Sequence, residues 1–127
     1  MGRMAPHKYN QTLTLMNFNV EKPIYLQIAD AVCARVLAGE LKAEERIQSV
    51  REYGAELGVN PNTMARSYEK LTADGVIYNK RGIGFFIAPE ARDLILKRMK
   101  SDFQEREVPE IKAKLKLLGL DYTVFKD

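Results

Sequence analysis

The sequence contains no tryptophan, one cysteine and one histidine among its 127 residues. The single thiol, Cys33, cannot form an internal disulfide, and with His7 as the only imidazole we expect no zinc site. Apolar runs of the roughly 20 residues that a spanning helix needs are missing, and the N-terminus lacks the apolar segment of a signal peptide. We therefore expect a cytoplasmic protein without a metal or another cofactor.

Residue combinations that support catalysis are also scarce. The sequence has no phosphate-binding loop, no recognisable pairing of a nucleophile with a base, and no pair of carboxylates framed by glycines. We therefore expect a binding protein and not an enzyme.

The net charge of +3 is spread along the chain. Residues 1–23 carry three Lys/Arg against one Asp/Glu, residues 24–88 carry eight against eight, and residues 89–127 carry nine against eight. The total charge therefore says little about an anionic partner. An argument for nucleic acid has to rest on where individual charges lie in the fold.

Two helices are expected in the first half of the chain. Helical periodicity begins at Ile24 and ends at Gly39, with apolar residues three and four positions apart. A second, short helix is expected to follow Ser49 and to end at Gly58. Ser49 and Glu52 have the spacing of a capping box, in which two backbone N–H groups at the helix start are bonded reciprocally.

A third helix and a hairpin follow directly. Asn60 is expected to cap the helix start, Pro61 suits its first turn because a proline there loses no hydrogen bond, and the helix ends before Asp74. The β-rich runs at residues 76–80 and 84–88 flank a glycine-containing turn, which is typical of a β-hairpin.

One face of the third helix carries no apolar residue. At about 100° per residue, Met64, Tyr68, Leu71 and Thr72 fall on a side that can pack. The other side carries polar residues only: Asn62, Thr63, Arg66, Ser67 and Lys70.

This order of elements predicts an α+β winged helix-turn-helix domain with three helices and a wing of two to three strands. In such domains the second paired helix enters the major groove, where Asn can bind an adenine edge and Arg a guanine edge or a phosphate. Two alternatives stay open: an ordinary solvated helix face, and a winged helix that contacts proteins without reading DNA. Salt separates DNA binding from protein contact, because phosphate contacts weaken steeply as salt rises.

Several motifs in one order add a resemblance. They are "PIYLQI", "AGEL", "SVRE", "ELGVNPNT", "YEKL" followed by "DGVI", and the G-x-G-x-F that begins at Gly82. From Pro23 to Ala88 the sequence resembles the DNA-binding domain of the GntR family of bacterial transcription regulators. The resemblance implies DNA contacts by Arg51, Asn60, Asn62, Thr63, Arg66, Arg81 and Gly82, to which the helix face adds Ser67 and Lys70.

The sequence departs from the family pattern in places. Glu44 and Glu45 stand where Pro-Gly is usual, and Pro61 stands where many members carry an arginine. Gly54 lies inside the second helix, which it should weaken by about 0.5 to 1 kcal/mol relative to alanine. These departures bear on the preferred DNA sequence more than on DNA binding.

The tail contains two further helical patterns, the second of them opened by Pro109 and ended by Gly119. Its length resembles the short YtrA-type branch of the family, in which such a tail dimerises. We expect an arm at residues 1–22, the winged domain at 23–88 and a two-helix dimerisation tail at 89–127. Packing of the tail onto its own domain is the alternative. The predicted dimer contacts are Leu94, Ile95, Met99, Phe103, Ile111, Leu115 and Leu118.

Together these expectations describe a homodimeric DNA-binding regulator. The family resemblance implies a repressor that binds a near-palindromic operator in double-stranded DNA. A small-molecule effector of unknown identity is a further hypothesis, and a membrane partner is not expected.

Overall fold

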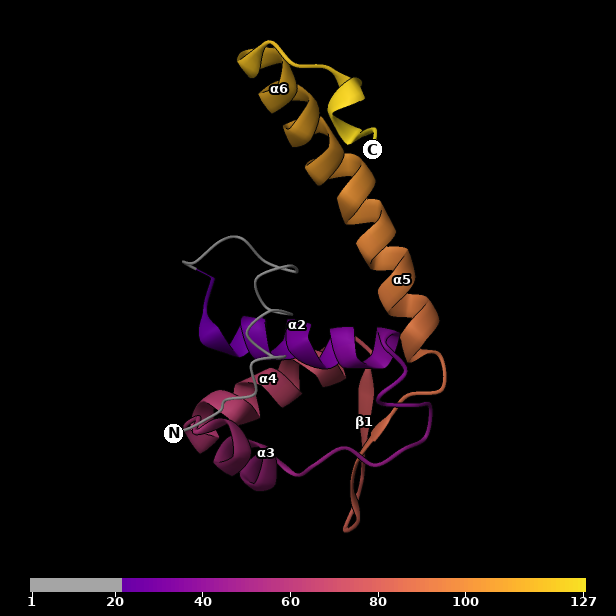
Figure 1. Ribbon diagram of the computed structural model, residues 1–127. Coiled ribbons are helices and arrows are strands. Elements are labelled where there is room, and N and C mark those ends of the chain that lie inside the picture. The colour runs from indigo at the N-terminus through magenta and orange to yellow at the C-terminus, as the bar shows by residue number, and fades with distance from the viewer. Residues whose placement is uncertain (1–21) are drawn as a thin grey trace. The chain divides into compact units, whose positions relative to one another are not determined.

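The computed structural model describes residues 22–127 (Figure 1). Residues 1–21 of the predicted arm, His7 among them, lie outside the described residues. The chain divides into two compact units, the first ending at Ile95 and the second spanning Leu96–Asp127. Each unit is described by itself.

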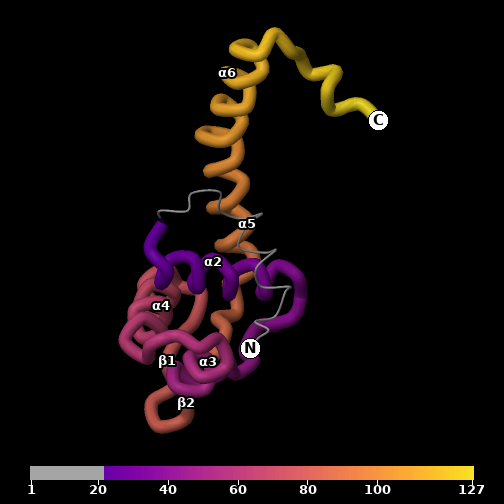
Figure 2. The backbone as a smooth tube through the Cα atoms, turned by 60° about the vertical axis from the view of Figure 1, so that its left-hand side comes forward, coloured from indigo at the N-terminus to yellow at the C-terminus, as the bar shows by residue number. Residues whose placement is uncertain are grey.

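The first unit contains three helices that the sequence predicted. They are α2 (Ile24–Leu37), α3 (Val50–Leu57) and α4 (Pro61–Ala73). α4 packs against both α2 and α3, and α2 lies next to α4 in both views (Figures 1 and 2). α4 is therefore the helix that contacts both of the others.

A two-stranded antiparallel sheet forms the wing. β1 (Ile77–Lys80) pairs with β2 (Gly84–Ile87), with Ile77 opposite Ile87 and Lys80 opposite Gly84. A third strand is reduced to one bridge between Arg46 and Phe86, supported by the bond from the Ile47 N–H to the Phe85 carbonyl at 2.9 Å. The predicted α+β winged helix fold is confirmed.

The core of the first unit is apolar and draws on every element. Side chains here are withdrawn from water almost completely, and each large one stabilises the fold by about 1.5 to 3 kcal/mol. The largest fully buried residues are Tyr53, Tyr68, Ile47, Met64, Leu71, Ile77, Ile87, Val32, Val76 and Ser67.

The second unit is helical. α5 (Ala91–Asp102) enters it from the first unit and is followed by the π-helical segment η1 (Phe103–Glu107), by α6 (Val108–Leu118) and by the short 3-10 helix η2 (Tyr122–Phe125). Both predicted tail helices are present, but η1 joins them without a loop.

The π-helical segment has a local cause in Pro109. Proline lacks an N–H group and its ring clashes with the carbonyl four residues earlier in a regular α-helix. In η1 the turn is wider, and the Val108 N–H bonds to the carbonyl of Phe103, five residues back. α6 then ends at Gly119, whose φ of 71° is readily adopted by glycine.

None of the helices in residues 22–127 combines the length and the apolar character needed to cross a membrane.

Candidate nucleic-acid interface

The start of α3 is fixed by the predicted capping box. The Glu52 N–H donates to Ser49 Oγ at 3.0 Å, and the Ser49 N–H donates to Glu52 Oε1 at 2.9 Å. The bond from the Ser49 N–H stabilises the ionised carboxylate, so the pKa of Glu52 lies below its ordinary value of 4.5. The capping box orients the first turn of α3, where Arg51 lies.

The turn between α3 and α4 depends on two glycines. Gly58 ends α3 with a left-handed φ of 68°. Gly54 lies where the two helices approach closely, because a Cβ atom there would be 3.0 Å from the Val59 carbonyl oxygen and 3.1 Å from Met64 Cγ. The sequence interpretation of Gly54 as a weak helix residue was therefore incomplete: its missing side chain lets the helix pair close.

α4 begins as predicted. Asn60 Oδ1 accepts a hydrogen bond from the Asn62 N–H at 2.7 Å, and Pro61 occupies the first turn. Asn60 Oδ1 is therefore engaged in capping, whereas the exposed Asn62 carries its amide on the surface.

Ser67 corrects the predicted polar face. Its relative exposure is 0%, and its hydroxyl donates to the Tyr25 carbonyl at 2.7 Å. The prediction that Ser67 contacts DNA is wrong, because the residue seals the contact between α2 and α4. Thr72, predicted on the packing side, is exposed instead and bonds to the Tyr68 carbonyl at 2.7 Å.

The remaining face residues differ in how they are held. Arg66 is exposed, and its guanidinium carbon lies 4.1 Å from the centre of the Tyr25 ring. Lys70 is also exposed but forms an ion pair with Asp74 at 3.1 Å. Thr63 is half-buried. Arg66 is thus held by an aromatic ring, whereas Lys70 is held by a carboxylate.

Arg51 projects from the first turn of α3 and is exposed. Within residues 22–127 its guanidinium forms no ion pair. A cation near a helix N-terminus is disfavoured by the helix dipole, and an external anion would relieve this.

The wing tip is short and cationic. Arg81, Gly82 and Ile83 connect the strands, and the Ile83 N–H closes the turn on the Lys80 carbonyl at 2.9 Å. Gly82 has a φ of 79°, and both Arg81 and Gly82 are exposed. A tip without a side chain at its centre allows close approach to another surface.

Two cations of the wing, Arg46 and Lys80, were not predicted from the sequence. The Arg46 side chain lies across Gly84, where a Cβ atom would be 2.9 Å from Arg46 Nε. Lys80 places its ammonium 4.7 Å from the centre of the Phe86 ring. Gly84 signalled a close approach in the sequence, but not which side chain approaches.

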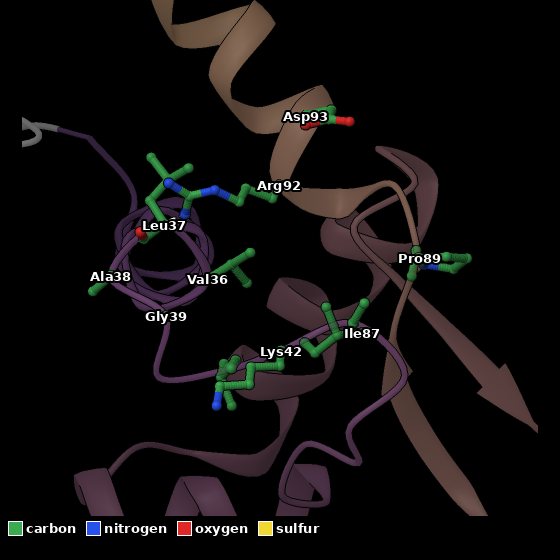
Figure 3. Close-up of a pocket in the computed structure, with 12 residues that line it drawn as sticks. Val36, Leu37, Ala38, Gly39, Lys42, Ile87, Pro89, Arg92 and Asp93 are labelled. Carbon is green, nitrogen blue, oxygen red and sulfur yellow. Dashed lines mark hydrogen bonds between the residues drawn. The ribbon is translucent and has the colours of Figure 1, made fainter.

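A cavity of about 580 Å³ lies in the first unit, away from these residues in sequence (Figure 3). Its walls come from the end of α2, residues 41–43, the end of β2 and the first turn of α5. Arg92 reaches over the end of α2 and donates to the Leu37 carbonyl at 2.6 Å. This bond satisfies a carbonyl that the helix itself leaves unpaired.

The predicted dimer residues fall into two groups. Ile95 is 2% exposed and belongs to the core of the first unit, so its predicted role in dimer contact is wrong. Leu94 is half-buried, with its Cδ1 atom close to Gly75. In the second unit Met99 and Leu115 are half-buried, and the large apolar residues that stay exposed are Phe103, Ile111, Leu117, Leu118, Leu120, Tyr122, Val124 and Phe125.

A helix pair whose second member exposes polar and cationic side chains, beside a glycine-tipped wing, defines a winged helix-turn-helix domain. A model of the bacterial regulatory proteins of the gntR family matches residues 24–87. The chain is 37% identical to the uncharacterized HTH-type transcriptional regulator YhcF of Bacillus subtilis, over 81% of this chain and 84% of that protein.

Two further comparisons agree. The chain is 32% identical to the HTH-type transcriptional repressor YtrA of Bacillus subtilis, over 78% of this chain and 70% of that protein. A crystal structure of a GntR-family regulator from Bacteroides thetaiotaomicron matches with a TM-score of 0.66 and 47% identity, covering 81% of this chain and 89% of that chain. The chain belongs to the GntR family of bacterial DNA-binding transcriptional regulators.

Proposed function

We propose that this regulator reads a specific duplex DNA site with the N-terminal half of α4 in the major groove and the wing alongside. The observation that carries the proposal is the division of α4 into a packed side and an exposed side. Met64, Tyr68 and Leu71 are at most 1% exposed, whereas Asn62 and Arg66 are exposed. The exposed side has the donors and acceptors that base edges and phosphates require.

Each remaining site residue has a role within this proposal. Asn62 and Arg66 read base edges, and Thr63 offers a methyl group or a hydroxyl. Two further residues contact phosphates: Asn60, at the helix start, and Lys70. Lys70 leaves its ion pair with Asp74 to do so. Arg51 binds a phosphate beside the groove, and Arg81 enters the minor groove while Gly82 permits the close approach.

The test compares three arginine or lysine variants on a duplex selected from a random-sequence library. Arg66→Ala should weaken binding by about 1 to 3 kcal/mol and relax sequence preference, whereas Arg51→Ala should weaken binding to all sequences alike. Lys97→Ala, which removes one exposed charge from α5, is the matched control and should bind as the wild type does. Full affinity in both arginine variants would refute the assignment of this face.

We further propose that the tail dimerises the protein. Exposed side chains such as Phe103, at 48%, and Leu118, at 60%, leave apolar surface in contact with water, and covering it is favourable. A two-fold dimer would present two copies of α4 to half-sites of a near-palindromic operator.

Repression and location follow from the same proposal. YtrA of Bacillus subtilis is named a repressor, and a protein that occupies an operator can exclude polymerase from it. A regulator that binds the bacterial chromosome acts in the cytoplasm, so we place this protein there.

A small-molecule effector is the last part of the proposal, and we place it in the cavity of Figure 3. The cavity's volume of about 580 Å³ falls within the range of about 300 to 1,000 Å³ that is usual for ligand sites. Val36, Leu41 and Ile87 offer apolar contact, and the charged side chains in the lining are Lys42, Arg92 and Asp93. A nuclear magnetic resonance screen of small carboxylates should move amide signals of residues 36–43, and a screen that moves none would argue against this location.

A further inference from the structure

The contact between Arg66 and Tyr25 joins the exposed face of α4 to the first turn of α2. The guanidinium carbon lies 4.1 Å from the ring centre, which is the distance of a stacked cation–π contact. Arg66 forms no ion pair within residues 22–127, so the ring is the group that holds it.

Tyr25 is itself held in place by α4. Its carbonyl accepts the hydroxyl of the buried Ser67, at 2.7 Å, and Ser67 follows Arg66 in the chain. The Tyr25 side chain is half-buried, and its hydroxyl makes no hydrogen bond within the described residues. Tyr25 therefore contacts Arg66 through the face of its ring and not through its hydroxyl.

Stacking uses the face of a guanidinium and leaves the N–H groups at its edge available. A free arginine side chain loses rotamer freedom when it binds at an interface, and this loss of entropy weakens binding. A ring that restricts the Arg66 side chain in the free protein reduces the rotamer entropy that is lost when DNA binds.

We propose that Tyr25 is a positioning residue for DNA reading, which orients the Arg66 guanidinium while making no base contact itself. This inference rests on the proposed DNA-reading role of α4. Lys70 offers the contrast on the same face: its ammonium is tied to Asp74 by an ion pair, which DNA has to replace.

The test is a double-mutant cycle on the selected duplex, read by fluorescence anisotropy at one fixed salt concentration. Tyr25→Leu removes the ring but keeps apolar bulk and the backbone carbonyl that Ser67 uses, and it should weaken binding about 2- to 10-fold. Tyr25→Phe keeps the ring and should bind within about 2-fold of the wild type. In the Arg66→Ala background, Tyr25→Leu should cause no further loss.

The outcomes separate this inference from the proposed function. If the wild type binds and Arg66→Ala weakens binding, but Tyr25→Leu binds normally or loses as much in the Arg66→Ala background, positioning by Tyr25 is refuted while DNA reading stands. If the wild type selects no duplex, both fall. Thermal unfolding of each variant identifies a loss of affinity that comes from unfolding.

Discussion

At the residue scale, the neighbours Arg66 and Ser67 show that a helical projection does not predict which polar residues are buried. Both are polar and both fall on the side of α4 without apolar residues, yet Arg66 is exposed and Ser67 is 0% exposed. The difference is set by Tyr25, more than 40 residues away in sequence, whose carbonyl accepts the Ser67 hydroxyl. A serine bonded to a backbone carbonyl is as compatible with burial as an alanine, and periodicity alone does not reveal such a partner.

Replacing Gly54 by alanine tests how closely α3 and α4 approach each other. In a helix with free space around this position, Gly54→Ala should stabilise the protein by about 0.5 to 1 kcal/mol. Here the new Cβ atom would meet the Val59 carbonyl at 3.0 Å, and overpacking of this kind costs about 1 to 3 kcal/mol. We expect Gly54→Ala to lower the free energy of unfolding by about 1 kcal/mol, measured by urea denaturation.

The matched control is Ala55→Gly, at the next, exposed position of the same helix. It should cost about 0.5 to 1 kcal/mol through helix propensity alone. A stabilised Gly54→Ala variant would mean that the turn relaxes around the added methyl group.

At the element scale, helix boundaries were predictable because caps are local. Ser49 with Glu52, and Asn60 with Pro61, fix the starts of α3 and α4 through bonds spanning three residues or fewer. The π-helical segment η1 was not predicted, since a proline in this position is compatible with a loop, a new helix or a widened turn. The third strand of the wing is one bridge, and its extent was not predictable because its pairing partners in β2 are distant in sequence.

The capping box gives the prediction at this scale. The pKa of Glu52 is lowered in the folded protein by its bonds with Ser49. Its contribution to stability is therefore present above its ordinary pKa of 4.5 and is lost as the pH falls through the lower folded value. Glu52→Gln should be less stable than the wild type at neutral pH, and thermal unfolding should show this difference shrinking as the solution is acidified below that range. An unchanged difference at low pH would mean that the carboxylate charge contributes nothing.

At the scale of the whole molecule, the two compact units bury apolar surface very differently. The first unit has a continuous core, whereas α6 contains no buried residue at all. Sequence periodicity found the apolar residues of both units but did not distinguish them, so Ile95 was grouped with the tail although it packs in the first unit.

Tail dimerisation gives the prediction at this scale. Leu115→Asp should shift the protein towards monomer in analytical ultracentrifugation, because a carboxylate in a covered apolar surface is costly. Ala113→Asp introduces the same charge at an exposed position of α6 and should leave the association unchanged. Equal behaviour of both variants, with helix content preserved, would place the dimer contact elsewhere.

The DNA-binding surface that we propose consists of α4 and the wing. Amide chemical shifts of isotopically labelled protein, recorded during titration with the selected duplex, test it residue by residue. We predict that the largest changes fall at residues 60–70, around Arg51 and at the wing tip, residues 80–84. Changes confined to the tail, or to the face of α2 turned away from α4, would contradict the claim.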